Sequence, residues 1–172
     1  MKGTVVNCLA QMVTSRFGEN QWKESLCKAG LSADKTYGCL GDVDDSEVMA
    51  IFRGVSEVTS LPFVEVLNAF GHYWSESYAP KIYESYFKKA KSARELLLNL
   101  DHIHAAMTKS VKSAKPPRFR YEWQGKNRLI MHYYSHRNLV SLMPALILGV
   151  ANYYHEKVQV HSKGNAVYVD FS

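Results

Sequence analysis

The chain has 172 residues, of which 47% are hydrophobic and 22% are charged, a balance typical of one globular domain. No apolar run approaches the roughly 20 residues that span a bilayer, so we expect no membrane association. Cys8, Cys27 and Cys39 form no CxxC pair, which argues against a disulfide framework and favours a reducing, cytoplasmic location.

The first sixty residues have the pattern of a helical bundle. Apolar residues recur about every four positions over 2–17, and Gly18 ends this pattern. Two more helices are predicted over 20–29 and 46–59, with a glycine-containing loop between them. Asp44 and Glu47 have the spacing of a capping box, so we expect Asp44 to cap the helix that follows it.

Three further helices are predicted, from Pro62 through Trp74, over 81–89 and over 91–114. The last is the longest, and it contains neither Gly nor Pro. His104 lies on its apolar stripe, whereas His102 lies on its polar face. A buried imidazole is costly unless its nitrogens find partners. His104 is therefore either a core histidine bonded to a backbone carbonyl or a ligand of a metal or haem.

At Pro116-Pro117 the hydrophobic period changes from that of a helix to that of a strand. Two hairpins and one helix are predicted after this point: strands over 118–123, 128–137, 158–161 and 166–171, and a helix over 138–156. Pro144 lies inside that helix, so we expect a kink or a late start.

The predicted fold is α+β, with an N-terminal helical bundle packed on a C-terminal four-stranded antiparallel sheet and a helix between its hairpins. We expect a single domain over 1–172, with a helical part over about 1–60 and a second part over about 61–172.

Polar side chains alternate along the predicted strand 128–137. Tyr133, Ser135 and Arg137 are spaced by two and would face the same side of a sheet. Together they present a phenol, a hydroxyl and a guanidinium, and arginine is well shaped to bind a carboxylate through two parallel bonds. The row fits either an anionic ligand or the polar solvent face of a hairpin.

Basic residues gather within the twelve positions 109–120: Lys109, Lys112, Lys115, Arg118 and Arg120. This cluster is either a nucleic-acid patch or a solvated helix end, where cations are favourable. Because the chain has no known nucleic-acid motif, we expect no nucleic-acid partner.

The combination of His104, Pro117 and the Tyr133-x-Ser135-x-Arg137 motif resembles the H-NOX family of haem nitric oxide and/or oxygen binding domains. The haem domain of soluble guanylate cyclase is related to this family. The resemblance covers essentially the whole chain, and further segments share it: MKG at the N-terminus, Phe70-Gly71-x-x-Trp74 and Asp101-x-x-His104.

The resemblance implies a haem b (iron protoporphyrin IX) buried between the helical part and the sheet. It assigns His104 as the iron ligand and Pro117 as the residue that presses on the macrocycle. His102 is a rival ligand, but its polar helical face counts against it. The remaining implied contacts are the propionate-binding Tyr133, Ser135 and Arg137, and the distal Val5, Trp74 and Leu142.

Ligand preference depends on hydrogen-bond donors in the distal pocket. In oxygen-binding members of the family a tyrosine follows the arginine of the motif by five positions, and that position is Leu142 here. We therefore expect binding of nitric oxide and carbon monoxide without a stable oxygen complex. The alternative is an oxygen-binding haem sensor or carrier with a distal donor such as Trp74, or else Tyr73 or Tyr78.

The implied function is that of a stand-alone bacterial gas sensor and not an enzyme, because no catalytic constellation is present. Nitric oxide would release the bond between His104 and iron, and the resulting conformational change would reach a signalling histidine kinase or a diguanylate cyclase in trans. A haem-free interaction domain, with His104 in its core, is a further alternative.

Overall fold

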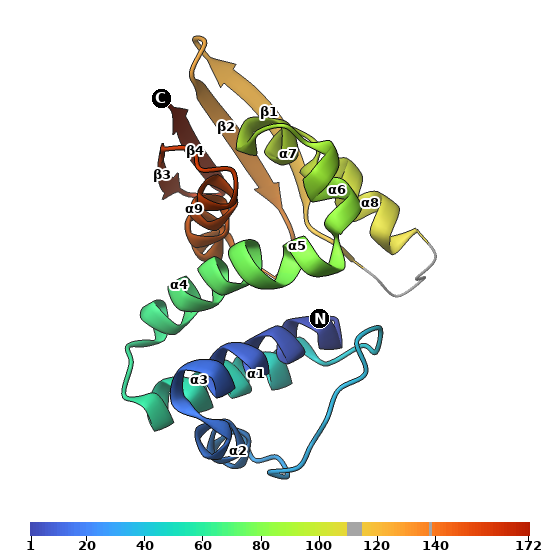
Figure 1. Cartoon of the computed structure of the whole chain (residues 1–172), viewed down its shortest axis with the longest axis vertical. Helices are drawn as coiled ribbons and strands as arrows, with labels where there is room; N and C mark the ends of the chain where they lie inside the picture. Colours follow the sequence, from blue (N-terminus) through green and yellow to red (C-terminus); the bar gives the residue numbers. More distant parts are fainter. Residues whose placement is uncertain (110–114, 138) are drawn as a thin grey trace. The chain divides into compact units, whose positions relative to one another are not determined.

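The computed structural model describes residues 1–109, 115–137 and 139–172 (Figure 1). These residues form two compact units, Met1–Tyr73 and Trp74–Ser172. The division lies further along the chain than the boundary expected near residue 60. Residues 110–114, at the end of the longest predicted helix, and residue 138 lie outside the described residues. In the described part, no helix is long and apolar enough to cross a membrane.

The first unit consists of four helices that agree closely with the predicted ones. Their apolar faces bury Val6, Leu9 and Met12 of the first helix against Leu26 and Ile51. The helices are α1 (Gly3–Phe17), α2 (Glu19–Lys28), α3 (Asp45–Thr59) and α4 (Phe63–Tyr73).

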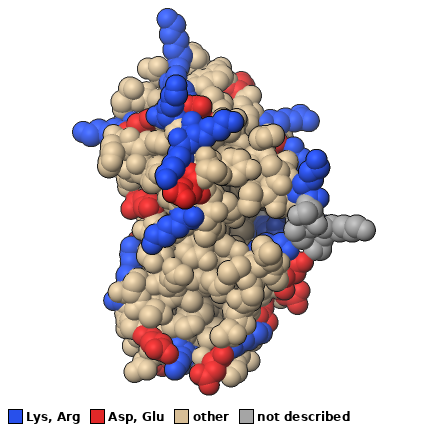
Figure 2. Space-filling view, turned by 45° about the vertical axis from the view of Figure 1, so that its right-hand side comes forward, with Lys and Arg blue, Asp and Glu red and all other residues tan. Residues whose placement is uncertain are grey.

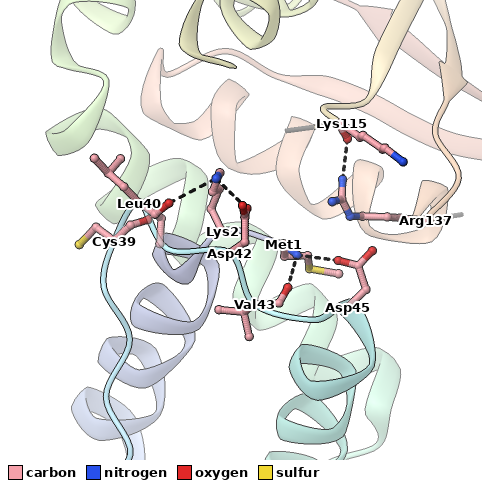
Figure 3. Close-up of polar contacts among 10 residues, drawn as sticks. Met1, Lys2, Cys39, Leu40, Asp42, Val43, Asp45, Lys115 and Arg137 are labelled. Carbon is pink, nitrogen blue, oxygen red and sulfur yellow. Dashed lines mark hydrogen bonds and ion pairs between the residues drawn. The ribbon is translucent and has the colours of Figure 1, made fainter. Parts of the chain in front are cut away.

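The loop before α3 holds the start of α1. The Gly3 N–H donates to the Gly41 carbonyl over 2.9 Å. The Lys2 ammonium lies 2.6 Å from the Asp42 carboxylate (Figure 3). A side chain at Gly3 would collide with the Gly38 carbonyl. This close approach explains why the chain has a glycine at the first turn of an otherwise ordinary helix.

The predicted capping box at the start of α3 is wrong. Asp44 occupies the N-cap position, but its side chain makes no capping hydrogen bond. The Glu47 carboxylate instead accepts hydrogen bonds from Lys35 (2.8 Å) and Tyr37 (2.7 Å) of the preceding loop. Glu47 is thus engaged by a long-range contact that the local spacing does not reveal.

The second unit begins with helical segments where longer helices were predicted. The predicted helix 81–89 is interrupted at Tyr83, and the predicted helix 91–114 is interrupted at Asn99. The side-chain amide of Asn99 donates to the Glu95 carbonyl over 2.9 Å and so competes with the backbone hydrogen bonds of the helix. The segments are the π-helix η1 (Trp74–Tyr78), α5 (Ala79–Ile82), α6 (Glu84–Lys89), α7 (Ala93–Leu98) and α8 (Leu100–Thr108).

The sheet of the second unit confirms the predicted four antiparallel strands. They pair in the order β1-β2-β4-β3, which places the two hairpins side by side. The strands are β1 (Arg118–Gln124), β2 (Arg128–Tyr134), β3 (Val158–Lys163) and β4 (Ala166–Phe171).

The predicted strand 128–137 is three residues too long. β2 ends at Tyr134, which pairs with Arg118, the first residue of β1. Pro116 and Pro117 precede Arg118 and have no N–H groups, so they cannot extend the ladder. Ser135 and Arg137 therefore lie beyond the strand.

The helix predicted over 138–156 starts late, as Pro144 indicated. A short 3₁₀ helix, η2 (Val140–Leu142), leads into α9 (Met143–Tyr153), and Pro144 lies in the first turn of α9. Helices α7 and α9 cover one face of the sheet (Figure 1). The buried core between them includes Leu96, Leu97, Leu129, Met131, Ile147, Val167 and Val169.

Candidate functional site

His104 lies on α8 with its ring against Phe119 of β1, at 5.8 Å between ring centroids. Its Nδ1 atom is buried and has no hydrogen-bond partner among the described residues. His102, two residues earlier, is exposed, as its polar helical face predicts. Buried polar atoms are nearly always satisfied, so this imidazole is exceptional for a core histidine.

The pKa of His104 is lowered. Burial is the largest cause, because a charged ring is unfavourable away from water. Polar contact with the Pro117 backbone and the negative charge of Asp101 raise the pKa and so oppose this effect. The ring is therefore held in the neutral form, which is the form that binds a metal.

A cavity of about 150 Å³ lies beside His104. One group of lining residues comes from η1, α5 and α6 and from Tyr83, which lies between α5 and α6. The other group comes from α7 and α8. The mostly apolar and aromatic lining suits a flat macrocycle, and the neutral imidazole suits its iron. The volume is below the roughly 300–1,000 Å³ of whole small-molecule sites, so the cavity would accommodate only part of a haem. The lining residues are Trp74, Ala79, Tyr83, Tyr86, Phe87, Leu96, Leu100, Ile103, His104, Met107 and Thr108.

Of the aromatic residues considered as distal donors, Trp74 lies at the cavity. Its ring stacks on Tyr78 at 5.6 Å, and Tyr78 is itself 8% exposed and does not line the cavity. Tyr83 and Tyr86 do line it, and the sequence-based assignment missed both. The sequence gives no signal for this placement, because Tyr83 lies at a break between α5 and α6 that the predicted helix over 81–89 does not reveal.

Tyr133 is the only motif residue on β2. It is 6% exposed, and its ring lies 5.8 Å from that of Phe119, which also contacts His104. Beyond the strand, the Arg137 N–H donates to the Ser135 hydroxyl over 3.2 Å. The Arg137 guanidinium donates to the Lys115 carbonyl over 2.6 Å (Figure 3). A turn, and not the predicted strand alternation, thus brings Ser135 and Arg137 together.

The other predicted contacts are distributed over both units. Pro117 is half-buried directly before β1, and its carbonyl influences the ring of His104. Leu142 is half-buried in η2 and does not line the cavity, and Val5 is half-buried on α1 of the first unit.

Asp101 attaches α8 to β1. Its carboxylate accepts two parallel hydrogen bonds from Arg118, of 2.7 and 2.6 Å, and a third from the Phe119 N–H of 2.8 Å. The Asp101 N–H donates to the Tyr121 hydroxyl over 3.1 Å. The pKa of Asp101 is lowered to about 2, chiefly by the hydrogen bonds from Arg118.

The basic cluster is partly occupied by contacts within the protein. Arg118 is paired with Asp101, and the Arg120 guanidinium lies 5.6 Å from the centre of the Tyr134 ring. Lys112 lies outside the described residues. Acidic side chains are interspersed among the basic ones on the face drawn in Figure 2, which does not favour a nucleic-acid interface.

Comparison with known proteins identifies the family. The model of the haem-NO-binding family (HNOB) matches residues 2–162. The chain belongs to this family. H-NOX domains bind haem and respond to gaseous ligands, so this domain is a haem-based gas sensor related to soluble guanylate cyclase and not an enzyme.

The relatives include enzymes that are much longer than this chain. The soluble guanylate cyclase gcy-37 of Caenorhabditis elegans is 28% identical over 133 residues, which are 76% of this chain and 19% of that protein. The cyclase gcy-35 of the same organism is 22% identical over 141 residues, 80% of this chain and 20% of that protein. The chain spans about a fifth of the length of these relatives.

Similar solved structures are H-NOX domains. An oxygen-binding H-NOX domain related to soluble guanylate cyclases, in its oxygen complex, superposes with a TM-score of 0.85 at 28% identity, covering 99% of this chain and 95% of that one. An H-NOX protein from S. oneidensis in the Fe(II)NO ligation state has a TM-score of 0.89 at 22% identity, covering 100% and 99%. Both confirm the α+β fold with its four-stranded antiparallel sheet.

The ion pair of Asp101 predicts a pH dependence. Its pKa is about 2 in the folded chain, against an ordinary value of 3.8, so folding favours the charged carboxylate. The stabilisation is complete above the ordinary value and is lost as the pH falls through it towards 2. Urea unfolding of Asp101→Asn should therefore show reduced stability at pH 7 and a difference from the wild type that shrinks below about pH 4. A difference that stayed constant down to pH 2 would contradict this account.

Proposed function

We propose that nitric oxide is the gas that this domain detects. The observation that carries the proposal is the half-buried ring of His104, whose buried Nδ1 lacks a partner, beside an aromatic cavity in a member of a haem-binding family. A ferrous haem supplies an iron that binds nitric oxide and carbon monoxide. His104 would provide the axial nitrogen, and its lowered pKa keeps that nitrogen available.

We assign the remaining contacts to the chain's own residues. Tyr133, Ser135 and Arg137 would hold the propionates, since they carry hydrogen-bond donors at the C-terminal end of β2 and directly after it. Pro117 would lie against the macrocycle, and Val5, Trp74 and Leu142 would line the distal side. The group is a non-covalent haem b, because the chain has no CxxCH attachment motif.

The preference for nitric oxide rests on Leu142. An aliphatic side chain offers no hydrogen bond to polar bound oxygen, whereas nitric oxide depends much less on such a donor. The rival proposal is an oxygen-binding sensor or carrier. It is supported by Trp74, Tyr83 and Tyr86 at the cavity, each of which carries a donor, and by the likeness to a solved oxygen complex.

Signalling would begin when His104 leaves the iron. The imidazole is fixed to α8, so its release would displace this helix and favour a second conformation of the domain. A partner protein would respond to that change, and a signalling histidine kinase or a diguanylate cyclase fits this role. We place the protein in the cytoplasm, and its three free cysteines support a reducing compartment.

Two histidine variants test the iron ligand. His104→Ala should lose the Soret band of the purified protein or retain haem only when imidazole is added, because the axial nitrogen is gone. His102→Ala is the matched control, since its side chain is exposed two residues away, and it should bind haem as the wild type does. Equal haem retention in both variants, or loss in His102→Ala alone, would contradict the assignment.

Exposure to air tests the gas preference. The absorption spectrum of the reduced protein should not change on brief exposure to air, but should shift when nitric oxide is added. A stable spectrum of an oxygen complex would support the rival proposal. In that case Tyr83→Phe, Tyr86→Phe and Trp74→Phe would identify the donor, because the oxygen dissociation rate rises when the donor is removed.

A further inference from the structure

The backbone of β3 pairs on one side only, because β3 is an edge strand in the order β1-β2-β4-β3 (Figure 1). The Phe171 N–H donates to the Asn127 carbonyl over 2.9 Å, so the odd-numbered residues of β4 bond towards β2 and the even-numbered ones towards β3. Tyr168 pairs with His161, so the odd-numbered residues of β3 bond to β4. The even-numbered residues of β3 direct their N–H and C=O groups away from the sheet, and no described residue bonds these groups: Val158, Val160 and Ser162.

The opposite edge of the sheet, β1, is partly closed by α8. The Phe119 N–H points away from β2 and donates to the Asp101 carboxylate over 2.8 Å. The ladder of β3, by contrast, is continuous from Val158 to Lys163 and contains no proline or bulge, the devices that commonly block an edge. Among the described residues, β3 therefore presents the edge on which another strand can pair.

The side chains of β3 define which strand suits this edge. Val158 and Val160 lie on the helix-covered face, where they are half-buried against the core. Exposed lysines stand at both ends, Lys157 directly before β3 and Lys163 as its last residue. The segment 157–163 contains no acidic residue. A complementary strand thus has apolar residues at alternate positions, to cover the valines, and acidic residues near its ends.

A second copy of β3 does not suit this edge. Only one antiparallel register pairs all the outward residues with one another, and it places Val160 opposite its own copy and Val158 opposite Ser162. The same register places Lys157 of each copy opposite Lys163 of the other. Like charges directly opposite each other destabilise a sheet, so the lysines oppose self-pairing and favour an acidic strand.

We propose that the free edge of β3 binds an extended acidic segment of a partner protein, which joins the sheet as a further strand. The outward N–H and C=O groups supply the main-chain hydrogen bonds, and the valines and the two lysines select the side chains. The surface uses neither the cavity nor His104, so its binding does not depend on which gas the haem holds.

Amide hydrogen exchange tests the geometry of this pairing. The experiment uses the whole haem-bound chain and a short synthetic peptide in which valine alternates with serine and glutamate stands at both ends. The peptide should slow exchange on the order of tenfold or more at the outward amides of Val158, Val160 and Ser162. The amides of Gln159 and His161 bond to β4 and should already exchange slowly without it. Unchanged exchange at the outward amides would overturn the proposal.

Charge reversal tests the selection by the lysines. A peptide with lysine in place of glutamate should bind the wild type more weakly on the order of tenfold, since two exposed attractions become repulsions. The double variant Lys157→Glu, Lys163→Glu should prefer this second peptide instead. Lys28→Glu with Lys89→Glu is the matched control, because it changes the net charge equally at exposed positions of α2 and α6 and should keep the wild-type preference. Equal binding of both peptides to the wild type would contradict the selection.

A proline tests the main-chain bonds without relying on charge. Val160→Pro removes an outward N–H but no bond to β4, and proline is tolerated on an edge strand in this orientation. It should abolish the slowing by the peptide at the remaining outward amides while the haem spectrum stays that of the wild type. Ser162→Pro serves the same purpose if Val160→Pro does not fold. Undiminished peptide binding in the folded variant would overturn the proposal.

The concentration of the protein separates a partner strand from a second copy. Without peptide, the outward amides should exchange equally fast at low and high protein concentration, because the lysines oppose self-pairing. Slower exchange at high concentration would show that a second copy occupies the edge, and it would overturn the assignment of an acidic partner.

Discussion

A buried imidazole nitrogen without a hydrogen-bond partner is the constraint on which the rest of the second unit depends. Leaving such an atom unsatisfied costs about 1–3 kcal/mol, so a fold retains it only where something else is gained. The surroundings of His104 keep the ring neutral and place it beside a cavity, although a single hydrogen bond to Nδ1 would have been enough for a core histidine. A neutral imidazole beside an aromatic cavity is consistent with the proposed role of His104 as the haem ligand.

The architecture of the second unit serves to hold this imidazole in place. α8 has nine residues, too few to be stable alone, so its position depends on tertiary contacts. Ile103 of α8 is buried in the hydrophobic core of this unit, and the Asp101 carboxylate fixes α8 to β1. The same strand supplies Phe119 to the ring of His104. The sheet thus supports the helix that carries the proposed iron ligand.

Much of this organisation could be predicted from the sequence, because it follows from periodicity. The helices of the first unit, the four strands and the late start at Pro144 were recovered from apolar spacing and from the missing N–H of proline. His104 could be separated from His102 by helical face alone. These features depend on neighbours within about four residues, which a sequence displays directly.

The predictions that were wrong depend on competition from distant or alternative partners. Glu47 does not form a capping box with Asp44, since Lys35 and Tyr37 bind its carboxylate. Asn99 interrupts the long helix because its side chain competes for a helical carbonyl. Ser135 and Arg137 leave the strand because the partner strand begins after two prolines.

The position of Tyr83 at the cavity, in turn, depends on a break between two short helices that a continuous helical pattern conceals.

The electron paramagnetic resonance spectrum of the reduced protein with nitric oxide tests the central claim most directly. The unpaired electron couples to every nitrogen on the axis through the iron. If His104 is the ligand and is released, the spectrum will show splitting from one nitrogen, that of nitric oxide. Splitting from two nitrogens would show that the imidazole stays bound, and it would contradict the account in which the departure of His104 starts the signal.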